Sequence, residues 1–209
     1  MTVNFKEEIR KDSELMLDKH NVRDEFKGMT VEKRKEYCDN EVRNFDVMLL
    51  NVTGDLNTST IIRTCHALGV RKVIIAGKNR FDNRGLVGVE NYTNIERHPC
   101  LSDDLIIDET VVMEIFKSDN YFPIFVETGG EILNHFRWED RIPNIHEGKI
   151  PLLIFGNEGR GIGDNILALR DKIDSLTVGI PMKGIVRSFN VSNAASIVIY
   201  DMVSKLGWI

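Results

Sequence analysis

The sequence predicts an α/β fold built on a mostly parallel sheet, and two observations carry this prediction. From Asp46 onward, short apolar runs alternate with stretches of helical periodicity. Continuous apolar strands separated by helices are typical of a parallel sheet that is covered on both faces. In addition, two glycine-bearing loops, residues 156–163 and 181–189, each follow an apolar run. Because ligands bind beyond the carboxyl ends of such strands, we expect the functional site at these loops.

The first 45 residues differ from the rest of the chain. They are highly charged, and their apolar residues have helical spacing in two segments that break near Asn21 and at Lys27–Gly28. Thr30 suits the N-cap of the second helix. These residues carry too little apolar surface for a core of their own. We therefore expect a helical extension over residues 1–45 and one domain over residues 46–209.

The elements of the domain follow from the alternation of patterns. Strands are expected at residues 47–52, 71–76, 122–127, 152–155 and 175–180. Helices are expected at residues 60–68, 109–117, 164–171 and 190–206. Gly69 closes the first of these helices, and Gly77 ends the second strand. The segment 87–96 fits neither pattern clearly.

Length and composition are those of an ordinary globular protein. The 209 residues, 42% of them hydrophobic, are enough for one domain with a full core. No apolar run approaches the roughly 18–20 residues of a membrane helix, and the N-terminus lacks the features of a secretory signal. The three cysteines are far apart and odd in number, which argues against a disulfide framework and a CxxC metal site. We therefore expect a cytoplasmic protein.

The loop at residues 155–163 does not match the common nucleotide-binding patterns. It lacks the Gly-Lys-Ser/Thr ending of a phosphate-binding P-loop. Its glycines, at positions 156, 159, 161 and 163, do not have the GxGxxG spacing of a dinucleotide site. A plain flexible connection is the alternative interpretation. However, Glu158 places a carboxylate among the glycines, where it is more useful for positioning a polar ligand or an arginine than for folding.

Four small polar residues lie at the start of the last helix: Ser188, Asn190, Ser192 and Asn193. One of them is expected to serve as the N-cap, since Ser and Asn satisfy the free N–H groups of a first helical turn. Four such residues exceed what a cap requires. A role in ligand or substrate binding is therefore expected for the others.

Arg63 follows the first strand, among apolar and small neighbours. A surface arginine is the default interpretation of this position. An arginine is also always protonated and carries five donors, so it can bind a phosphate or stabilise an oxyanion. His66, one turn later, is better explained as a half-buried histidine with a hydrogen-bond partner than as a catalytic group. No His, Cys or carboxylate cluster has the spacing of metal ligands, so no metal is expected.

Three sequence blocks, in this order, resemble the SpoU-type RNA ribose 2′-O-methyltransferases of the SPOUT superfamily. The first block is NTSTIIRTCHALG (residues 57–69), the second is FGNEGRGI (155–162), and the third is IPMKGIVRSFNVSNA (180–194). The resemblance covers roughly residues 46–206. It implies a doubly wound α/β domain whose C-terminal part forms a trefoil knot, a topology that periodicity alone does not predict.

The resemblance also implies S-adenosylmethionine as cofactor, held largely by backbone groups. It implies homodimers formed through the last helix and the helix of the first block, with both subunits building the site. By position in the family, the cofactor-binding residues implied by the resemblance are Thr128, Gly156, Asn157, Ile180, Ser188 and Phe189.

The catalytic residues implied by the resemblance are Arg63, Asn57, Glu158 and Asn190. A ribose 2′-hydroxyl must lose its proton as it accepts the methyl group. Because a guanidinium is always protonated, Arg63 is expected to act electrostatically, on a phosphate or on the developing alkoxide, rather than as a plain general base. Glu158 is expected to hold Arg63 or the nucleotide, and Asn190 to orient the substrate or the third block.

The expected partner is an RNA, although the net charge of −5 is not that of a typical nucleic-acid binder. Local basic patches would have to hold the RNA, and each is equally well explained as a solvated surface charge. The extension does not resemble the α/β RNA-binding domain of many ribosomal-RNA members, which favours tRNA over rRNA. Candidates for the patches are Arg71 with Lys72, Lys78 with Arg80 and Arg84, and Lys183 with Arg187.

Two residues depart from the family pattern, and other functions remain open. Phe189 replaces the commonest leucine, and Asn193 stands where a small apolar residue is usual. A non-catalytic protein that binds RNA or a partner on the same fold is the main alternative. A related enzyme that methylates a base is another, although such enzymes generally lack the first block. A Rossmann-type nucleotide enzyme is the least favoured, because the glycine spacing fails.

Overall fold

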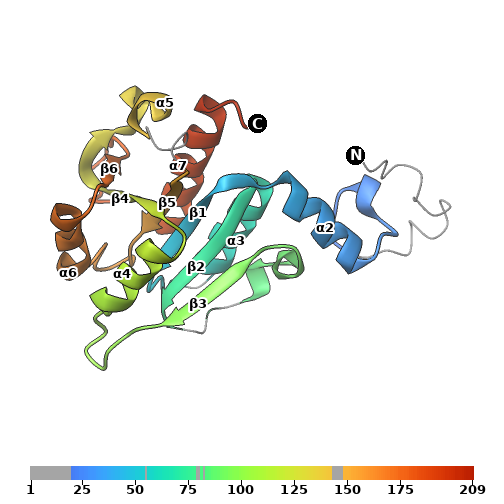
Figure 1. Ribbon diagram of the computed structural model, residues 1–209, viewed down its shortest axis with the longest axis horizontal. Coiled ribbons are helices and arrows are strands. Elements are labelled where there is room, and N and C mark those ends of the chain that lie inside the picture. The colour runs from blue at the N-terminus through green and yellow to red at the C-terminus, as the bar shows by residue number, and fades with distance from the viewer. Residues whose placement is uncertain (1–19, 55, 79–80, 82, 143–147) are drawn as a thin grey trace.

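The computed structural model describes residues 20–54, 56–78, 81, 83–142 and 148–209. Its centre is a six-stranded sheet in the order β3-β2-β1-β5-β4-β6, in which every neighbouring pair is parallel (Figure 1). The predicted α/β class is thereby confirmed. The strands are β1 (Arg43–Leu50), β2 (Val70–Gly77), β3 (Ile95–Pro99), β4 (Tyr121–Ile132), β5 (Ile150–Phe155) and β6 (Leu176–Gly179).

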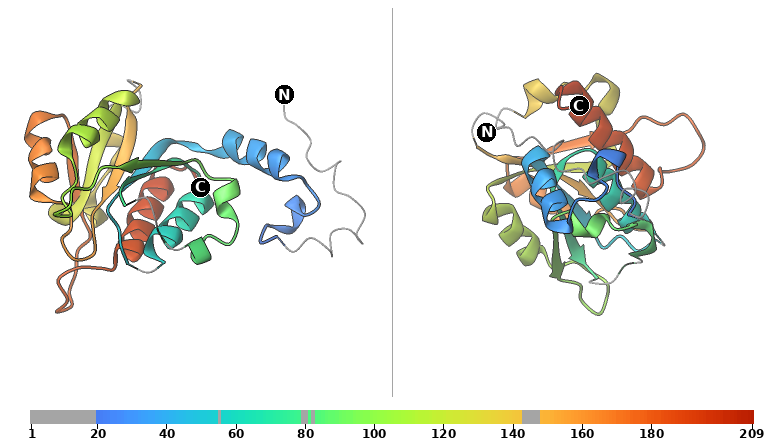
Figure 2. Two further views of the ribbon diagram at one scale, coloured as in Figure 1. Left: turned by 90° about the horizontal axis from the view of Figure 1, so that it is seen from below. Right: turned by 90° about the vertical axis from the view of Figure 1, so that its right-hand side faces the viewer.

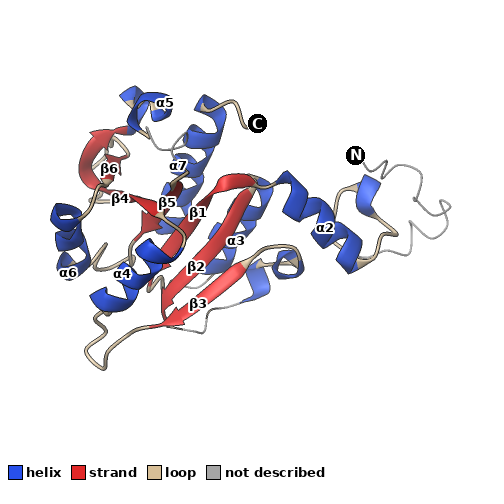
Figure 3. Cartoon of the chain, in the orientation of Figure 1, coloured by secondary structure: helices blue, strands red, loops and turns tan. Residues whose placement is uncertain are grey.

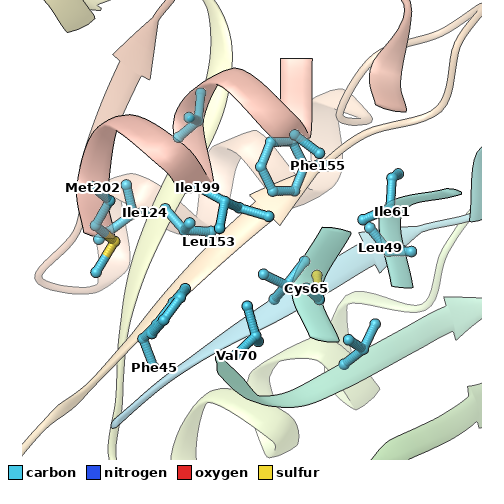
Figure 4. Close-up of a cluster of buried hydrophobic side chains, with 14 of the residues drawn as sticks. Phe45, Leu49, Ile61, Cys65, Val70, Ile124, Leu153, Phe155, Ile199 and Met202 are labelled. Atoms are coloured by element: carbon cyan, nitrogen blue, oxygen red, sulfur yellow. The ribbon is translucent and has the colours of Figure 1, made fainter. Parts of the chain in front are cut away.

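Helices cover both faces of the sheet (Figure 2). In β1, Val47 and Leu49 join the core cluster that includes residues of α3 and α7, while Met48 and Leu50 join the cluster on the opposite face, because successive side chains point to opposite sides. Figure 4 shows the first cluster, with Ile61 and Ile199 among its members. The covering helices are α3 (Asn57–Ala67) and α7 (Val191–Lys205) on one face, and α4 (Glu109–Ser118), α6 (Asp164–Leu167) and η7 (Ala168–Lys172) on the other.

Several elements differ from the sequence-based expectation. The predicted helix 60–68 begins three residues earlier, because Leu56 turns the chain at φ 65° and Asn57 opens α3. The predicted helix 164–171 is a single α turn, α6, followed by the 3-10 turn η7. The ambiguous segment 87–96 contains η4 (Val89–Asn91) and the start of the edge strand β3. Short elements without a clear pattern also occur: η3 (Asn83–Gly85), η5 (Leu133–His135) and α5 (Trp138–Arg141).

The extension contains the predicted second helix, α2 (Val31–Glu41), which Thr30 caps by accepting a hydrogen bond from the N–H of Lys33. The first predicted helical segment falls mostly outside the described residues, which add the 3-10 turn η2 (Asp24–Phe26). Arg34 of α2 is buried and donates to the Phe26 carbonyl at 3.0 Å and the Tyr92 hydroxyl at 3.2 Å. The bond to Tyr92, which directly follows η4 (Val89–Asn91), thus joins the extension to the domain.

A charged network joins the amino ends of three strands. Asp46 of β1 is fully buried and accepts from the Arg71 guanidinium of β2 at 2.9 Å and from the Tyr121 hydroxyl of β4. Asp119 accepts from the same guanidinium at 3.0 Å. Burial, followed by the bond to Asp46, raises the pKa of Tyr121 far above its ordinary value. The network pairs the buried carboxylate of Asp46 with a cation. It lies at the amino ends of the strands, away from the carboxyl ends where the site is expected.

The strand order does not by itself establish how the chain is threaded, so the trefoil knot stays a prediction. Within the part of the chain that the structure describes, no helix is both long enough and apolar enough to cross a bilayer.

Candidate functional site

The second and third blocks meet at a cavity of about 420 Å³ at the carboxyl edge of the sheet, and the loop before the first block is bonded to its wall. Figure 3 shows loops at the strand ends on this edge. The volume lies within the range of about 300–1,000 Å³ that is usual for small-molecule sites. All six residues predicted to bind the cofactor border this one cavity: Thr128, Gly156, Asn157, Ile180, Ser188 and Phe189.

Glu158 connects the second block to the loop after β1. One carboxylate oxygen, Oε1, accepts from the N–H of Gly54 at 2.6 Å and from Asn57 Nδ2 at 2.7 Å. The other, Oε2, accepts from the N–H of Thr53 at 3.0 Å. A Cβ at position 54 would lie only 2.6 Å from Oε1, so glycine is the residue that lets the backbone approach the carboxylate this closely.

The hydrogen bonds at Glu158 favour its charged form. Burial alone would raise the pKa of this carboxyl group, but the bonds from Thr53, Asn57 and Gly54 outweigh burial and leave the pKa below its ordinary value. The group is therefore an anion at neutral pH. An ionised carboxylate only accepts hydrogen bonds, so it fixes which end of the Asn57 amide points toward it.

The same amide continues the chain of bonds to the third block. Asn57 Oδ1 accepts from Asn190 Nδ2 at 3.2 Å. Asn190 Oδ1 in turn accepts from the N–H groups of Ser192 at 2.9 Å and Asn193 at 3.4 Å, and so caps α7. The predicted N-cap among the four polar residues is therefore Asn190. Three of the four predicted catalytic residues, Asn57, Glu158 and Asn190, form one connected network.

The loop of the second block is closed by its own polar groups. Asn157 exchanges two backbone hydrogen bonds with Gly161, at 2.9 and 2.8 Å. Its side-chain Oδ1 accepts from the N–H of Gly159 and its Nδ2 donates to the carbonyl of Asn51. A Cβ at Gly156 would lie 2.3 Å from the Gly161 carbonyl carbon. The cavity wall is thus backbone packed against backbone, which suits a ligand held largely by main-chain groups.

The third block leaves the body of the domain between β6 and α7 (Figure 2). Ile185 and Val186 at its tip are exposed, and Phe189 is 41% exposed at the cavity. Arg187 ties this segment to the second block by donating to the Gly159 carbonyl at 3.0 Å. The two glycine-bearing loops therefore contact each other beside the cavity.

Arg63 lies apart from the other three predicted catalytic residues. It is exposed on α3 and borders a different cleft, of about 840 Å³, between the extension and the domain. Within the described residues, no hydrogen bond or ion pair joins it to Glu158, Asn57 or Asn190. The expected Glu158–Arg63 contact is absent from the single chain, since Glu158 instead accepts from Thr53, Gly54 and Asn57.

The structure also shows the surroundings of other residues that the sequence analysis considered. His66 Nδ1 lies 3.2 Å from the Thr93 hydroxyl, and burial lowers its pKa, as suits a half-buried histidine with a partner. In the described ranges, no group of three or more His, Cys, Asp or Glu residues is arranged to hold a metal ion. Arg71 and Lys72 both pair with Asp119 at the amino edge, away from the cavity. Arg80 lies outside the described residues.

Three contributors to the site were not identified from the sequence. Thr53 and Gly54 supply the N–H groups that hold Glu158, and Glu127 borders the cavity at the bend in β4. The only available signals were a glycine three residues before the first block and a carboxylate directly after the apolar run 122–126. Neither signal identifies a partner without the fold.

The comparisons with known proteins agree with this geometry. The model of the SpoU rRNA methylase family matches residues 44–200. The tRNA (guanosine(18)-2′-O)-methyltransferase of Aquifex aeolicus is 29% identical over 182 residues, which cover 83% of this chain and 77% of that protein. The protein of the same name from Thermus thermophilus is 29% identical over 158 residues, covering 74% and 72%.

Solved structures show the same fold. The SpoU methyltransferase AviRb from Streptomyces viridochromogenes, in complex with the cofactor AdoMet, superposes with a TM-score of 0.59 and 26% identity. The match covers 79% of this chain and 59% of AviRb, so the chain spans about three-fifths of that protein. The TrmH/SpoU tRNA modifying enzyme of A. aeolicus has a TM-score of 0.61 at 22% identity, covering 85% and 86%.

Replacing Gly156 with alanine is expected to abolish binding of S-adenosylhomocysteine, measured by isothermal titration calorimetry. The added Cβ would collide with the Gly161–Ile162 backbone and displace the cavity wall. Gly184→Ala is the matched control, because a Cβ at position 184 meets nothing within 4 Å. Equal affinity of the two variants would contradict the proposed wall.

Replacing Glu158 with glutamine is expected to destabilise the fold in a pH-dependent way. A folded-state pKa below the ordinary value contributes stability that is present above the unfolded pKa, about 4.3, and is lost as the pH falls through the folded pKa. The difference in urea midpoint between wild type and variant should therefore be largest near pH 7 and shrink below about pH 4. A difference that stays constant from pH 7 to pH 3 would show that the carboxylate charge has no such role.

Proposed function

The chain belongs to the SpoU rRNA methylase family, and on that premise we propose that it transfers a methyl group from S-adenosylmethionine to a ribose 2′-hydroxyl of tRNA. One observation carries the proposal: the second and third blocks enclose one cavity, and a continuous chain of hydrogen bonds links them to Asn57 of the first. The choice of tRNA rests on the relatives, which are named as tRNA methyltransferases. A cytoplasmic location follows from that substrate as part of the proposal.

The cavity fits the cofactor in size and in the kind of donor it offers. Its wall at residues 156–161 is backbone, and the six predicted cofactor residues lie around it. We assign cofactor binding to these six. When bound, S-adenosylmethionine supplies an activated methyl group on a sulfonium. The residues of the chain position the acceptor oxygen behind that methyl group, and such alignment provides much of the rate of a displacement.

The catalytic roles follow from the network. Glu158, held as an anion, orients the Asn57 amide, and Asn57 orients Asn190 at the start of α7. This network supports the proposal that Asn57 and Asn190 orient the ribose. Arg63 stabilises the developing alkoxide or binds the neighbouring phosphate, and the proton leaves to a phosphate oxygen or to water. These steps require no metal ion.

A homodimer is part of the proposal, because Arg63 does not border the cofactor cavity of its own chain. It lies on α3, which packs against α7 through the hydroxyls of Thr64 and Ser196, 3.2 Å apart. Ile197 and Tyr200 on α7 are 38% and 57% exposed, which leaves apolar surface beside this contact. Pairing of these two helices between subunits would cover that surface and bring Arg63 toward the site of the partner.

We also propose that residues 1–45 are an extension of the domain 46–209, although β1 already begins at Arg43.

Labelled methyl transfer from S-adenosylmethionine tests the function. Total tRNA and unmodified rRNA are offered separately, and the nucleosides are then analysed. The expected product is a 2′-O-methylated nucleoside in the tRNA fraction. Label only in rRNA would overturn the substrate, and a methylated base would overturn the acceptor group. No label in either RNA, with S-adenosylhomocysteine still bound, would favour the non-catalytic alternative.

Replacing Arg63 with alanine is expected to abolish transfer while S-adenosylhomocysteine binding stays close to wild type, because Arg63 borders no part of the cofactor cavity.

Mixing this variant with Gly156→Val tests whether Arg63 acts on the site of the partner subunit. If Arg63 acts on the partner's site, mixed dimers regain activity. The Arg63→Ala subunit then binds the cofactor, and the Gly156→Val subunit supplies the arginine. No recovery in proven mixed dimers would place Arg63 in its own subunit's site, and normal turnover of the single variant would remove its role.

A further inference from the structure

Glu127 reaches the cofactor cavity through an irregularity in β4. Val126 and Glu131 both pair with Val178 of β6, so residues 127–130 bulge out of the ladder. Gly129 has φ +82°, and a Cβ at Gly130 would lie 2.6 Å from the Val178 carbonyl carbon. Bulges re-aim side chains next to functional sites. Here the bulge turns Glu127 and Thr128 to the border of the cavity.

The carboxylate of Glu127 is only partly satisfied by the protein. Its Oε1 accepts from the N–H and hydroxyl of Thr128, at 2.8 and 3.0 Å. Its Oε2 has one long contact, 3.4 Å from the N–H of Ile162. Gly161 lies opposite, where a Cβ would come within 3.0 Å of Oε2. The absence of a side chain at position 161 therefore keeps space beside this oxygen.

Within the part of the chain that the structure describes, Glu127 also has no cationic partner. The group is half-buried, yet no lysine, arginine or histidine of the described chain forms an ion pair with it within 4 Å. Two other carboxylates border the cavity, but Glu158 is committed to the loop after β1, and Asp164 is exposed at the start of α6. Arg160 and Arg187 also border the cavity, but among the described residues neither forms an ion pair with Glu127, so its partly buried carboxylate would favour a cationic ligand beside it.

We propose that Glu127 is a specificity-determining residue, whose carboxylate favours the cationic cofactor S-adenosylmethionine over the product S-adenosylhomocysteine. This inference rests on the proposed function. The two molecules differ in the methyl group and in the sulfonium charge that the methyl group creates. A carboxylate in a partly desolvated cavity attracts that charge, and the attraction disappears when the methyl group has been transferred. Glu127 thus promotes release of the spent cofactor.

Isothermal titration of wild type and Glu127→Gln with each ligand tests this inference. Glutamine keeps the shape and one acceptor oxygen but removes the charge. The affinity for S-adenosylmethionine is expected to fall about tenfold more than the affinity for S-adenosylhomocysteine, a difference of about 1.4 kcal/mol. Glu131→Gln is the matched control, because Glu131 lies on the same strand, is not part of the cavity border, and pairs with Arg141.

Each outcome has a distinct meaning. An equal loss of affinity for both ligands would overturn the inference, since Glu127 would then act by accepting a hydrogen bond or by shaping the loop. Unchanged affinities for both would overturn it as well. Failure of wild type to bind either ligand would contradict the proposed function rather than the role of Glu127. As a control for folding, the midpoint temperature of thermal unfolding of Glu127→Gln is expected to match that of wild type.

Discussion

The carboxylate of Glu158 is the constraint on which the site depends. Its bonds to the N–H groups of Thr53 and Gly54 join the loop after β1 to the loop after β5, two strands that are neighbours in the sheet. Because this anion only accepts hydrogen bonds, it sets the direction of the Asn57 amide, and that amide sets the direction of Asn190 at α7. One charge thus orders three segments that are far apart in the sequence.

The parallel sheet makes this arrangement possible because the two ends of its strands have different roles. The carboxyl ends of the parallel strands all lie at one end of the sheet, so the loops of the site meet there. At the other end, Asp46, Arg71 and Tyr121 hold the strand beginnings in place. The buried charge there is paired, whereas among the described residues no cation pairs with the half-buried carboxylate of Glu127, as expected if the first is structural and the second faces the proposed ligand.

Much of the fold and part of the site could be predicted from the sequence. The apolar runs located five strands, and the family resemblance selected six residues that border one cavity. The edge strand β3 was missed because it is only half-covered and carries charged residues such as Glu96 and Arg97. The partners of Glu158 and the bulge that turns Glu127 inward depend on register between distant strands. The separation of Arg63 from the cavity depends on which face of α3 it occupies, which periodicity did not resolve.

The backbone packing at Gly156 and Gly161 has a consequence for how such a protein diverges. Where a ligand is held by main-chain groups, most side chains around it are free to change without altering the contacts. Substitutions are then restricted mainly at the few glycine positions where any Cβ would collide with backbone atoms. The chemistry of the other side chains around the ligand is less restricted. Phe189, which borders the cavity, would be at a tolerant position of this kind under the proposed function. Under the proposed function, a pocket of this kind tolerates the divergence seen in relatives that are 29% identical to this chain.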